Sequence, residues 1–160
     1  MPVARRSLRF ASLDEAVRDA QHLLEAGYEM TGKWTLAQCV FHLTEYLRYP
    51  MDGFPPVPLP IRMLLWSVRN TMAKKLYHQV LEKQSMPSGK PTIPQSVSGP
   101  GREDQPAVDR LKETVDRWRT FGGALLPSPL FGAMTKDEFD QLHRVHMAHH
   151  LSFLVPRSSS

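Results

Sequence analysis

The chain has 160 residues, 41% of them hydrophobic, which suits one compact domain over residues 1–160 with a buried core. Its net charge is only +4, and its Lys and Arg residues are scattered among Asp and Glu without a basic stripe, so we expect no nucleic-acid partner. It has no apolar run near the ~20 residues that cross a bilayer, no signal peptide and a single cysteine, which together predict a cytoplasmic protein without a membrane partner.

Two helices are predicted in the first third of the chain, and each begins at a capping box. Ser12 has a glutamate three residues later and begins the first helix, which Gly27 ends. Thr35 has a glutamine three residues later and begins the second helix, which Pro50 is expected to end. Apolar residues recur at helical spacing in both, so each helix is expected to turn one face to the core.

Proline and glycine divide the middle of the chain. Five prolines between residues 50 and 60 exclude regular structure there, and residues 61–83 are predicted to form one long helix that begins at Pro60 or its neighbour. Residues 84–107 are rich in Pro, Gly and Ser and are predicted to form a flexible loop. A loop of this length in a small domain is either a mobile segment or a lid over a site.

Two more helices are predicted in the last third of the chain. One spans residues 107–121, and the other begins at a third capping box at Thr135 and runs to about Leu154. Residues 157–160 are expected to be a frayed tail. Since no segment alternates between polar and apolar residues for long enough to predict a strand, the predicted fold class is all-α, a bundle of four or five helices.

Four histidines lie within eight residues of the predicted last helix: His143, His146, His149 and His150. At about 100° per residue, all four point to the same side as the apolar residues of the helix, with His146 at the centre of that side. Each buried imidazole costs roughly 1–3 kcal/mol unless its nitrogens find partners. His146 and His150 are one turn apart and aim at one point, as in helical metal sites. Because the pattern lacks the glutamate of H-E-x-x-H, a zinc protease is excluded.

A metal site of this kind needs a third ligand from another segment, and His42 is the best candidate. It lies at the edge of the apolar stripe of the second helix, near Cys39 and Tyr46. A single histidine in such a place is more often structural than a ligand, so both interpretations stay open at this point. Cys39 offers a nucleophile or a soft ligand, although most lone cysteines in a helix stripe are core residues.

Two motifs that contain these histidines resemble those of the DinB-like superfamily of metal-binding helix bundles. The first is WTLAQCVFH, Trp34–His42, which matches W-[ST]-x-x-Q-x-x-x-H, and the second is HMAHH, His146–His150. The chain resembles more closely one branch of that superfamily, a domain of unknown function. Four further motifs carry this likeness, namely RRSLRF, DGFP, PLFGAMT and HHLSFL-x-P, at Arg5–Phe10, Asp52–Pro55, Pro129–Thr135 and His149–Pro156.

The resemblance implies an up-down-down-up four-helix bundle, here with an extra short helix and long Pro/Gly-rich loops. It also implies a divalent metal ion held by three histidines: His42, His146 and His150. Three polar residues are expected to support these ligands without binding the ion: His149, Gln38 and His143.

Three imidazole ligands leave a coordination position open, which is typical of catalytic metal sites. The ion is expected to be Zn, Ni or Fe, among which imidazole ligands do not discriminate. Glu45 and Tyr46, about one turn beyond His42, are candidate acid–base groups.

Three functions are compatible with such a site. Some relatives in the superfamily are transferases or isomerases that use mycothiol, bacillithiol or glutathione, so the first hypothesis is a metal-dependent transferase acting with a low-molecular-weight thiol. A metal-dependent hydrolase with a metal-activated water is the second. The third is a non-catalytic metal-binding module associated with stress. The expected partner is a small-molecule substrate, and a homodimer stays open, although the sequence has no apolar stripe that argues for one.

Overall fold

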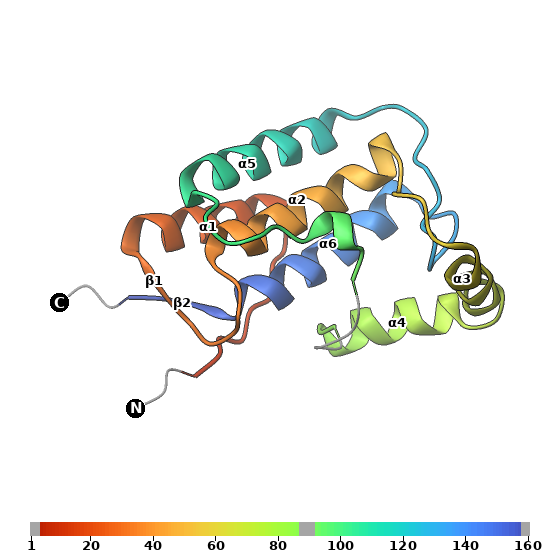
Figure 1. Cartoon of the computed structure of the whole chain (residues 1–160), viewed down its shortest axis with the longest axis horizontal. Helices are drawn as coiled ribbons and strands as arrows, with labels where there is room; N and C mark the ends of the chain where they lie inside the picture. Colours follow the sequence, from red (N-terminus) through yellow and green to blue (C-terminus); the bar gives the residue numbers. More distant parts are fainter. Residues whose placement is uncertain (1–3, 87–91, 158–160) are drawn as a thin grey trace.

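A computed structural model describes residues 4–86 and 92–157 of the chain (Figure 1). This part of the chain folds into six α-helices, a short 3-10 helix and two short strands. In chain order the elements are α1 (Leu13–Ala26), β1 (Tyr28–Met30), α2 (Leu36–Asp52), α3 (Leu59–Thr71), α4 (Ala73–Lys83), η1 (Pro94–Ser96), α5 (Asp104–Thr120), α6 (Lys136–Leu151) and β2 (Leu154–Pro156). Residues 158–160 of the predicted frayed tail lie outside the described residues. That residues 1–160 form a single domain stays a prediction.

The helices that carry the candidate ligands, α2 and α6, begin at the capping boxes predicted for them. Thr35 accepts a hydrogen bond from the backbone N–H of Gln38 (3.3 Å), and the Gln38 side chain accepts one from the Thr35 N–H (3.0 Å). Thr135 and Glu138 make the same pair of bonds at the start of α6 (3.2 and 2.8 Å). Ser12 caps α1 by accepting from the N–H of Glu15 (3.2 Å), but the Glu15 carboxylate accepts from the N–H of Ala11, so the predicted capping box is only half formed. These local bonds satisfy backbone donors that have no partner within the helix, and so they fix where each helix begins.

The prediction that Pro50 ends the second helix is wrong, because α2 continues to Asp52. Pro50 lacks an N–H, so α2 forgoes one hydrogen bond in its last turn but keeps its helical path. The helix ends at Gly53, which has a φ of 119° and donates its N–H to the carbonyl of Tyr49 (2.9 Å). That φ is readily adopted by glycine alone, and it turns the chain away from α2.

The single helix predicted over residues 61–83 is divided at Met72 into α3 and α4. Met72 has φ −128° and ψ −6°, outside the helical range. The side chains of Asn70 and Thr71 donate to carbonyls of the preceding turn, each at 2.7 Å, a kind of bond that weakens or bends helices. Apolar residues lie on both sides of the break, so hydrophobic periodicity alone did not reveal it.

The segment predicted as a flexible loop, residues 84–107, is partly built into the fold. It contains η1, and α5 begins at Asp104, before the predicted start at residue 107. The carboxylate of Asp104 accepts hydrogen bonds from the hydroxyl of Tyr28 (2.9 Å) and the backbone N–H of Ala37 (2.8 Å). These tertiary bonds hold the start of α5 and could not be read from the local sequence. Residues 87–91 lie outside the described residues, and a lid in this segment stays a prediction.

Two short strands correct the all-α prediction. Residues Tyr28–Met30 of β1 pair antiparallel with Leu154–Pro156 of β2. The last helix therefore ends at Leu151 and not near residue 154. Strands of three residues are too short to display an alternating pattern, and their partners come from opposite ends of the chain. The pairing joins the end of α6 to the segment that leads into α2.

The helices α1, α2, α5 and α6 pack around one core (Figure 1). Its fully buried large side chains are mostly aliphatic: Leu23, Leu36, Val40, Leu43, Leu47, Val108, Leu111, Met147, Leu151 and Leu154. A smaller cluster around Val80 places α4 against α6. No helix within residues 4–86 and 92–157 is long and apolar enough to span a membrane. The structure is thus mostly helical, while the up-down-down-up order of a four-helix bundle stays a prediction.

Candidate metal centre

Three histidines from two helices meet in the interior. His42 lies on α2, and His146 and His150 lie one turn apart on α6, which packs against α2. Their candidate ligand nitrogens all lie within 4.8 Å of one another, and Nε2 of His42 is 3.1 Å from Nε2 of His146. His42 and His146 are buried, while His150 is partly exposed. These three residues, called the histidine triad below, lie close enough to hold one metal ion.

The distance between two nitrogens of the histidine triad fits imidazole ligation. Imidazole nitrogens bind zinc at about 2.0–2.1 Å, so two of them at the tetrahedral angle lie roughly 3.3 Å apart. The 3.1 Å between Nε2 of His42 and Nε2 of His146 is close to this separation. Two nitrogens at this distance cannot both carry a proton on the line between them, so at least one directs a lone pair at the other. The residues present therefore fit an ion such as Zn, Ni or Fe.

The hydroxyl of Ser96, in η1, determines which nitrogen of His42 carries the proton. Ser96 Oγ donates its only hydrogen to the carbonyl of Ile93 (2.7 Å). It can therefore only accept from Nδ1 of His42, which lies 3.0 Å away in a buried contact. We assign the proton of neutral His42 to Nδ1 on this basis, which leaves the lone pair on Nε2, the nitrogen that faces His146. Hydrogen bonds of this kind orient metal-ligating histidines.

Two aromatic side chains pack against the histidine triad. The indole of Trp34 stacks on His150 with ring centroids 5.4 Å apart and planes 11° apart. The ring of Tyr46 lies 4.7 and 4.9 Å from the other two triad rings. The hydroxyl of Tyr46 shares a 3.0 Å hydrogen bond with Thr92, in the segment that leads to η1. Residues 92–96 thus contact the site through two hydroxyl groups.

Burial keeps the histidine triad neutral. It lowers the pKa of His42 to about 4, against a smaller opposite effect of the backbone of Ser96. Burial lowers the pKa of His150 to about 2, and smaller electrostatic effects of His42, His149 and Arg5 act in the same direction. The pKa of His146 also lies well below its ordinary value, first through burial and then through repulsion by protonated neighbours. Since only neutral imidazole binds metal, the three histidines are in the protonation state that metal binding requires at neutral pH.

The sequence model of one protein family matches residues 3–157, nearly the whole chain. That family is described as "Protein of unknown function (DUF1569)". The chain belongs to this family. No curated protein and no solved structure matches it. Membership of DUF1569 confirms a family of unknown function, while the relation to the DinB-like superfamily stays a prediction, and it assigns no activity to the histidine triad.

Of the two candidate acid–base groups in this DUF1569 protein, Tyr46 lies beside the triad, whereas Glu45 pairs with a neighbouring arginine. Glu45 forms an ion pair with Arg48 one turn later on α2, at 2.9 Å. Its exposed fraction is small, but none of its recorded hydrogen bonds or ion pairs within the described residues involves a triad histidine. Tyr46 is therefore the better candidate of the two.

The three residues expected to support the ligands lie in different surroundings. Gln38 donates from Nε2 to the carbonyl of Ser98 (3.1 Å), so it holds the segment that carries Ser96. Nδ1 of His149 accepts from the guanidinium of Arg5 (3.3 Å), because an arginine can only donate, and its ring lies 5.0 Å from that of His150.

His143 packs in the core of the DUF1569 fold, away from the triad rings. Its ring lies 5.3 Å from Trp118 and stacks on Phe139 at 6.0 Å. Its Nε2 is buried and has no hydrogen-bond partner among the described residues. Burial lowers the pKa of His143 to about 3. It therefore acts as an aromatic core residue, without direct contact to the candidate ion.

Several residues at the site had no role in the sequence-based prediction. Trp34 begins the WTLAQCVFH motif, so its position was available as a signal, but Thr92 and Ser96 lie in a Pro/Gly/Ser-rich stretch without one. Cys39, considered as a nucleophile or ligand, is buried, and burial raises the pKa of its thiol to about 12. Within the described residues its thiol makes one hydrogen bond, to the carbonyl of His150 at 4.0 Å, and it packs in the core as expected of a core cysteine.

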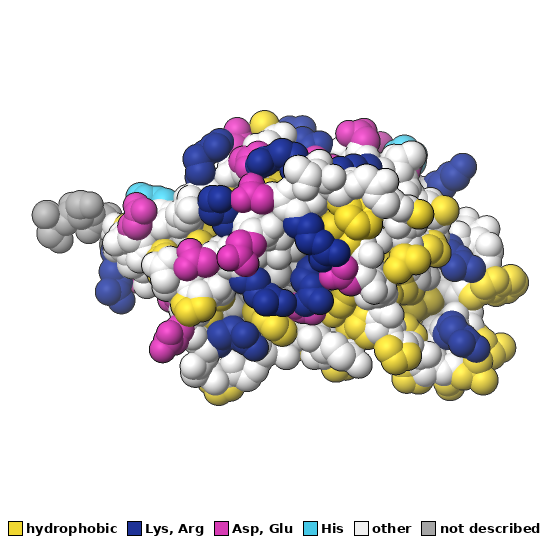
Figure 2. Space-filling model, turned by 90° about the horizontal axis from the view of Figure 1, so that it is seen from above, with side chains coloured by type: hydrophobic (Ala, Val, Ile, Leu, Met, Phe, Trp, Pro, Cys, Tyr) yellow, Lys and Arg dark blue, Asp and Glu magenta, His cyan; other side chains and the backbone are white. Residues whose placement is uncertain are grey.

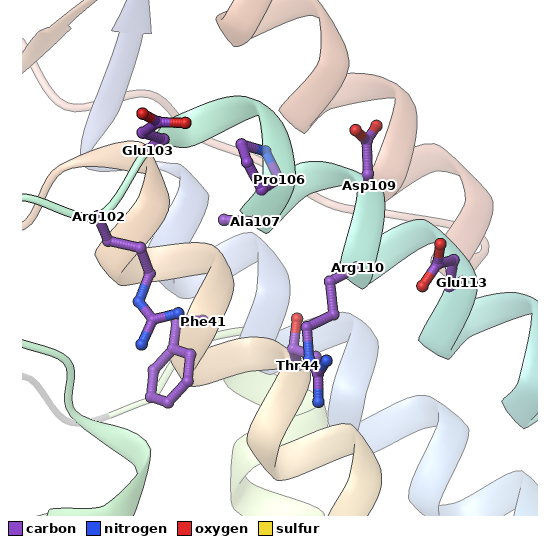
Figure 3. A pocket seen from close by; sticks show the side chains of 9 residues that line it. All are labelled: Phe41, Thr44, Arg102, Glu103, Pro106, Ala107, Asp109, Arg110 and Glu113. Carbon is purple, nitrogen blue, oxygen red and sulfur yellow. The ribbon is translucent and has the colours of Figure 1, made fainter.

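A hollow of about 570 Å³ lies between α2 and the beginning of α5 (Figure 3). The guanidinium of Arg102 covers the ring of Phe41 on one side of it, 4.2 Å from the ring centroid. Charged side chains of both signs line much of the rest, together with Thr44, Pro106 and Ala107. None of the lining residues belongs to the histidine triad, so we assign this hollow no part in the candidate metal centre of the DUF1569 protein.

Proposed function

We propose that this protein is a metal-dependent enzyme that holds a divalent ion through His42, His146 and His150. The observation that carries the proposal is the meeting of three neutral imidazoles, with the nearest two nitrogens 3.1 Å apart. Three protein ligands leave a coordination position for a reactant, in contrast to closed structural sites. The resemblance to the DinB-like superfamily and its up-down-down-up bundle adds support from the sequence motifs.

The reaction class that we propose is group transfer with a low-molecular-weight thiol. The support is the likeness to superfamily members that use such thiols. A bound divalent ion supplies Lewis acidity, which lowers the pKa of a thiol or water that it binds. The chain itself contributes the neutral imidazoles, the hydroxyl of Ser96 that orients His42, and Trp34, whose indole keeps water from one face of His150. Tyr46 is the candidate proton donor beside the rings.

Elemental analysis of the purified protein tests the metal proposal. We expect close to one equivalent of divalent metal per chain, lost in His146→Ala and His150→Ala but kept in the control His22→Ala, whose side chain is exposed on α1. Far-ultraviolet circular dichroism checks that each variant keeps its helices. If the wild type binds no added Zn²⁺, Ni²⁺ or Fe²⁺ at pH 7.5, the proposal fails.

A thermal-shift experiment tests the thiol proposal separately. Glutathione, bacillithiol and mycothiol are added to the metal-loaded protein, and S-methylglutathione serves as a control that lacks the free thiol. We expect at least one free thiol to raise the melting temperature of the wild type but not of His146→Ala. If no thiol does so while the metal is bound, transfer to a thiol is excluded, and the hydrolase and the non-catalytic metal-binding module are the remaining functions to test.

A further inference from the structure

α3 is a helix without a single buried residue. Five of its large apolar side chains, called the α3 surface below, are 50–65% exposed: Leu59, Ile61, Met63, Leu64 and Trp66. Figure 2 shows hydrophobic side chains gathered at the right-hand end of the molecule, where α3 lies in Figure 1. Single exposed apolar residues are ordinary, but a cluster of this kind on one element marks a contact surface. The structure thus reveals an exposed apolar face that the sequence alone did not indicate.

The α3 surface is too wide around the helix for one partner helix. At about 100° per residue, Leu59, Met63 and Trp66 lie within roughly 60° of one another. Leu64 and Ile61 lie about 100° and 160° from Met63, so the five side chains together span roughly 220° of the helix. A helix that packs on a neighbour buries a stripe roughly 100° wide. A second helix would leave part of the α3 surface in water, whereas a fluid apolar medium adapts to all of it.

The segment that contains the α3 surface carries positive charge only. Between Asp52 and Glu82 the sequence contains no acidic residue, and it contains four cationic ones: Arg62, Arg69, Lys74 and Lys75. The whole chain has 20 Lys and Arg and 16 Asp and Glu, so these four account for its entire net charge of +4. A second copy of the chain would bring the same four cations to the interface without a carboxylate from this segment to pair with them. The charge therefore favours an anionic partner over self-association.

We propose that the α3 surface inserts into the interfacial layer of a lipid bilayer that contains anionic lipids. Its apolar side chains enter the acyl boundary, while Arg62 and the exposed Lys74 and Lys75 contact the headgroups. Arginine and lysine side chains are long enough to reach the headgroups from an apolar helix, and the indole of Trp66 is typical of the membrane interface. α3 has 13 residues and so lies on the bilayer without spanning it. This proposal replaces the expectation of no membrane partner.

Co-sedimentation of the full chain with vesicles tests the proposal. One set of vesicles contains phosphatidylcholine alone, and the other contains phosphatidylcholine with roughly one third phosphatidylglycerol. Both are used at about 0.05 and 0.3 M NaCl. We expect binding to the anionic vesicles at low salt, binding at least about tenfold weaker to phosphatidylcholine, and partial release at high salt.

Two variants separate the apolar and the electrostatic contributions. Met63→Ser/Trp66→Ser and Arg62→Glu/Lys74→Glu/Lys75→Glu are each expected to weaken binding to the anionic vesicles by about tenfold or more. The control Arg9→Glu/Arg18→Glu/Lys33→Glu changes the net charge equally, at exposed positions away from α3. We expect its affinity for the anionic vesicles to fall by at most about threefold. Zn²⁺ binding and circular dichroism check that each variant is folded.

Three outcomes would overturn the proposal. The first is absence of binding to the anionic vesicles at low salt. The second is an equal loss in the control and in the α3 charge variant, because the effect would then come from net charge alone. The third is a dimer in lipid-free solution that Met63→Ser/Trp66→Ser converts to a monomer, because a second copy would then cover the α3 surface.

Discussion

Five histidines of α2 and α6 have a lowered pKa, and burial is the first cause in each case: His42, His143, His146, His149 and His150. For the histidine triad the neutral state is useful, because it is the state that binds metal. His143 and His149 gain no such ligand role, so their burial only adds a free-energy cost in acid. We therefore expect different effects from a change beside a triad nitrogen and from the replacement of a histidine that does not face the candidate ion.

Replacing Ser96 by alanine should weaken metal binding about tenfold, at the lower end of the range for a lost hydrogen bond to a ligand. Without the hydroxyl, Nδ1 of His42 loses the 3.0 Å side-chain partner that holds its proton there, so Nε2 is less firmly reserved for the ion. Competition with a chromophoric Zn²⁺ chelator measures the affinity, and ¹⁵N NMR of the imidazoles reports the tautomer of His42. The matched control is Ser98→Ala, two residues away, whose hydroxyl has no hydrogen-bond partner among the described residues. Equal Zn²⁺ affinities for both variants would contradict the assigned role.

Replacing His143 by leucine should make the protein less sensitive to acid. In the folded state the pKa of His143 lies at about 3, below the ordinary 6.5 of an unfolded chain. The stabilising effect of the neutral buried ring is therefore complete above pH 6.5 and declines as the pH falls from 6.5 towards 3, since only the unfolded chain takes up the proton. One such histidine costs roughly 2 kcal/mol at pH 5.

Urea unfolding of the metal-free wild type, His143→Leu and the exposed control His22→Leu at pH 7.5 and 5 checks this prediction. The wild type and the control should lose stability between the two pH values by similar amounts, and His143→Leu should lose less. An identical loss in all three proteins would mean that His143 is protonated in the folded state at pH 5.

At the scale of the elements, the start of α5 is tied to two other elements by one carboxylate. Asp104 accepts from the hydroxyl of Tyr28 in β1 and from the backbone N–H of Ala37 in the first turn of α2. The same tyrosine hydroxyl accepts from the N–H of Leu36 (3.0 Å). α2, which carries His42, is thus fixed at its beginning both by its own capping box and by residues from distant segments.

Asp104→Ala should lower the free energy of unfolding by about 1–3 kcal/mol, since it leaves a helix N–H and a tyrosine hydroxyl without their acceptor. The control is Asp109→Ala on the same helix, where the exposed carboxylate accepts from the side chain of Gln105 and from no other group among the described residues. That control should change the free energy of unfolding by less than about 0.5 kcal/mol. Chemical denaturation measures both, and equal effects would argue against a structural role of Asp104.

The same elements show how far sequence reasoning extends. The capping boxes at Thr35 and Thr135 predicted two helix starts correctly, because the bonds of a capping box join residues only three positions apart. The start of α5 was missed by three residues, because Asp104 is held by partners from β1 and α2. The division of residues 61–83 at Met72 was missed as well, because side-chain bonds to the preceding turn compete with the helix without changing its apolar pattern.

At the scale of the whole molecule, the histidine triad connects α2 and α6, two helices of the central core that are far apart in sequence. An ion held there would bind the folded chain and not the unfolded one, whose three histidines are separated. Folding and metal binding are therefore expected to be coupled.

Removing the metal with EDTA should lower the free energy of unfolding by about 4 kcal/mol when free Zn²⁺ exceeds its dissociation constant about a thousandfold. Differential scanning calorimetry with Zn²⁺ or EDTA measures the change. His146→Ala should melt at the same temperature with and without Zn²⁺, whereas His22→Ala should respond like the wild type. A wild-type melting temperature that does not depend on Zn²⁺ would contradict the coupling.

The sequence by itself determined the features that depend on neighbouring residues. The predominantly helical class follows from apolar periodicity, and the pairing of His146 with His150 follows from one turn of helix. The tertiary structure alone decided which distant groups meet: His42 with His146, the hydroxyl of Ser96 with His42, and β1 with β2. It also decided that α3 is left without a partner within the described chain, since burial is a property of the whole fold. Local bonds join residues a few positions apart and can be predicted from short stretches of sequence, whereas these contacts depend on how the helices pack.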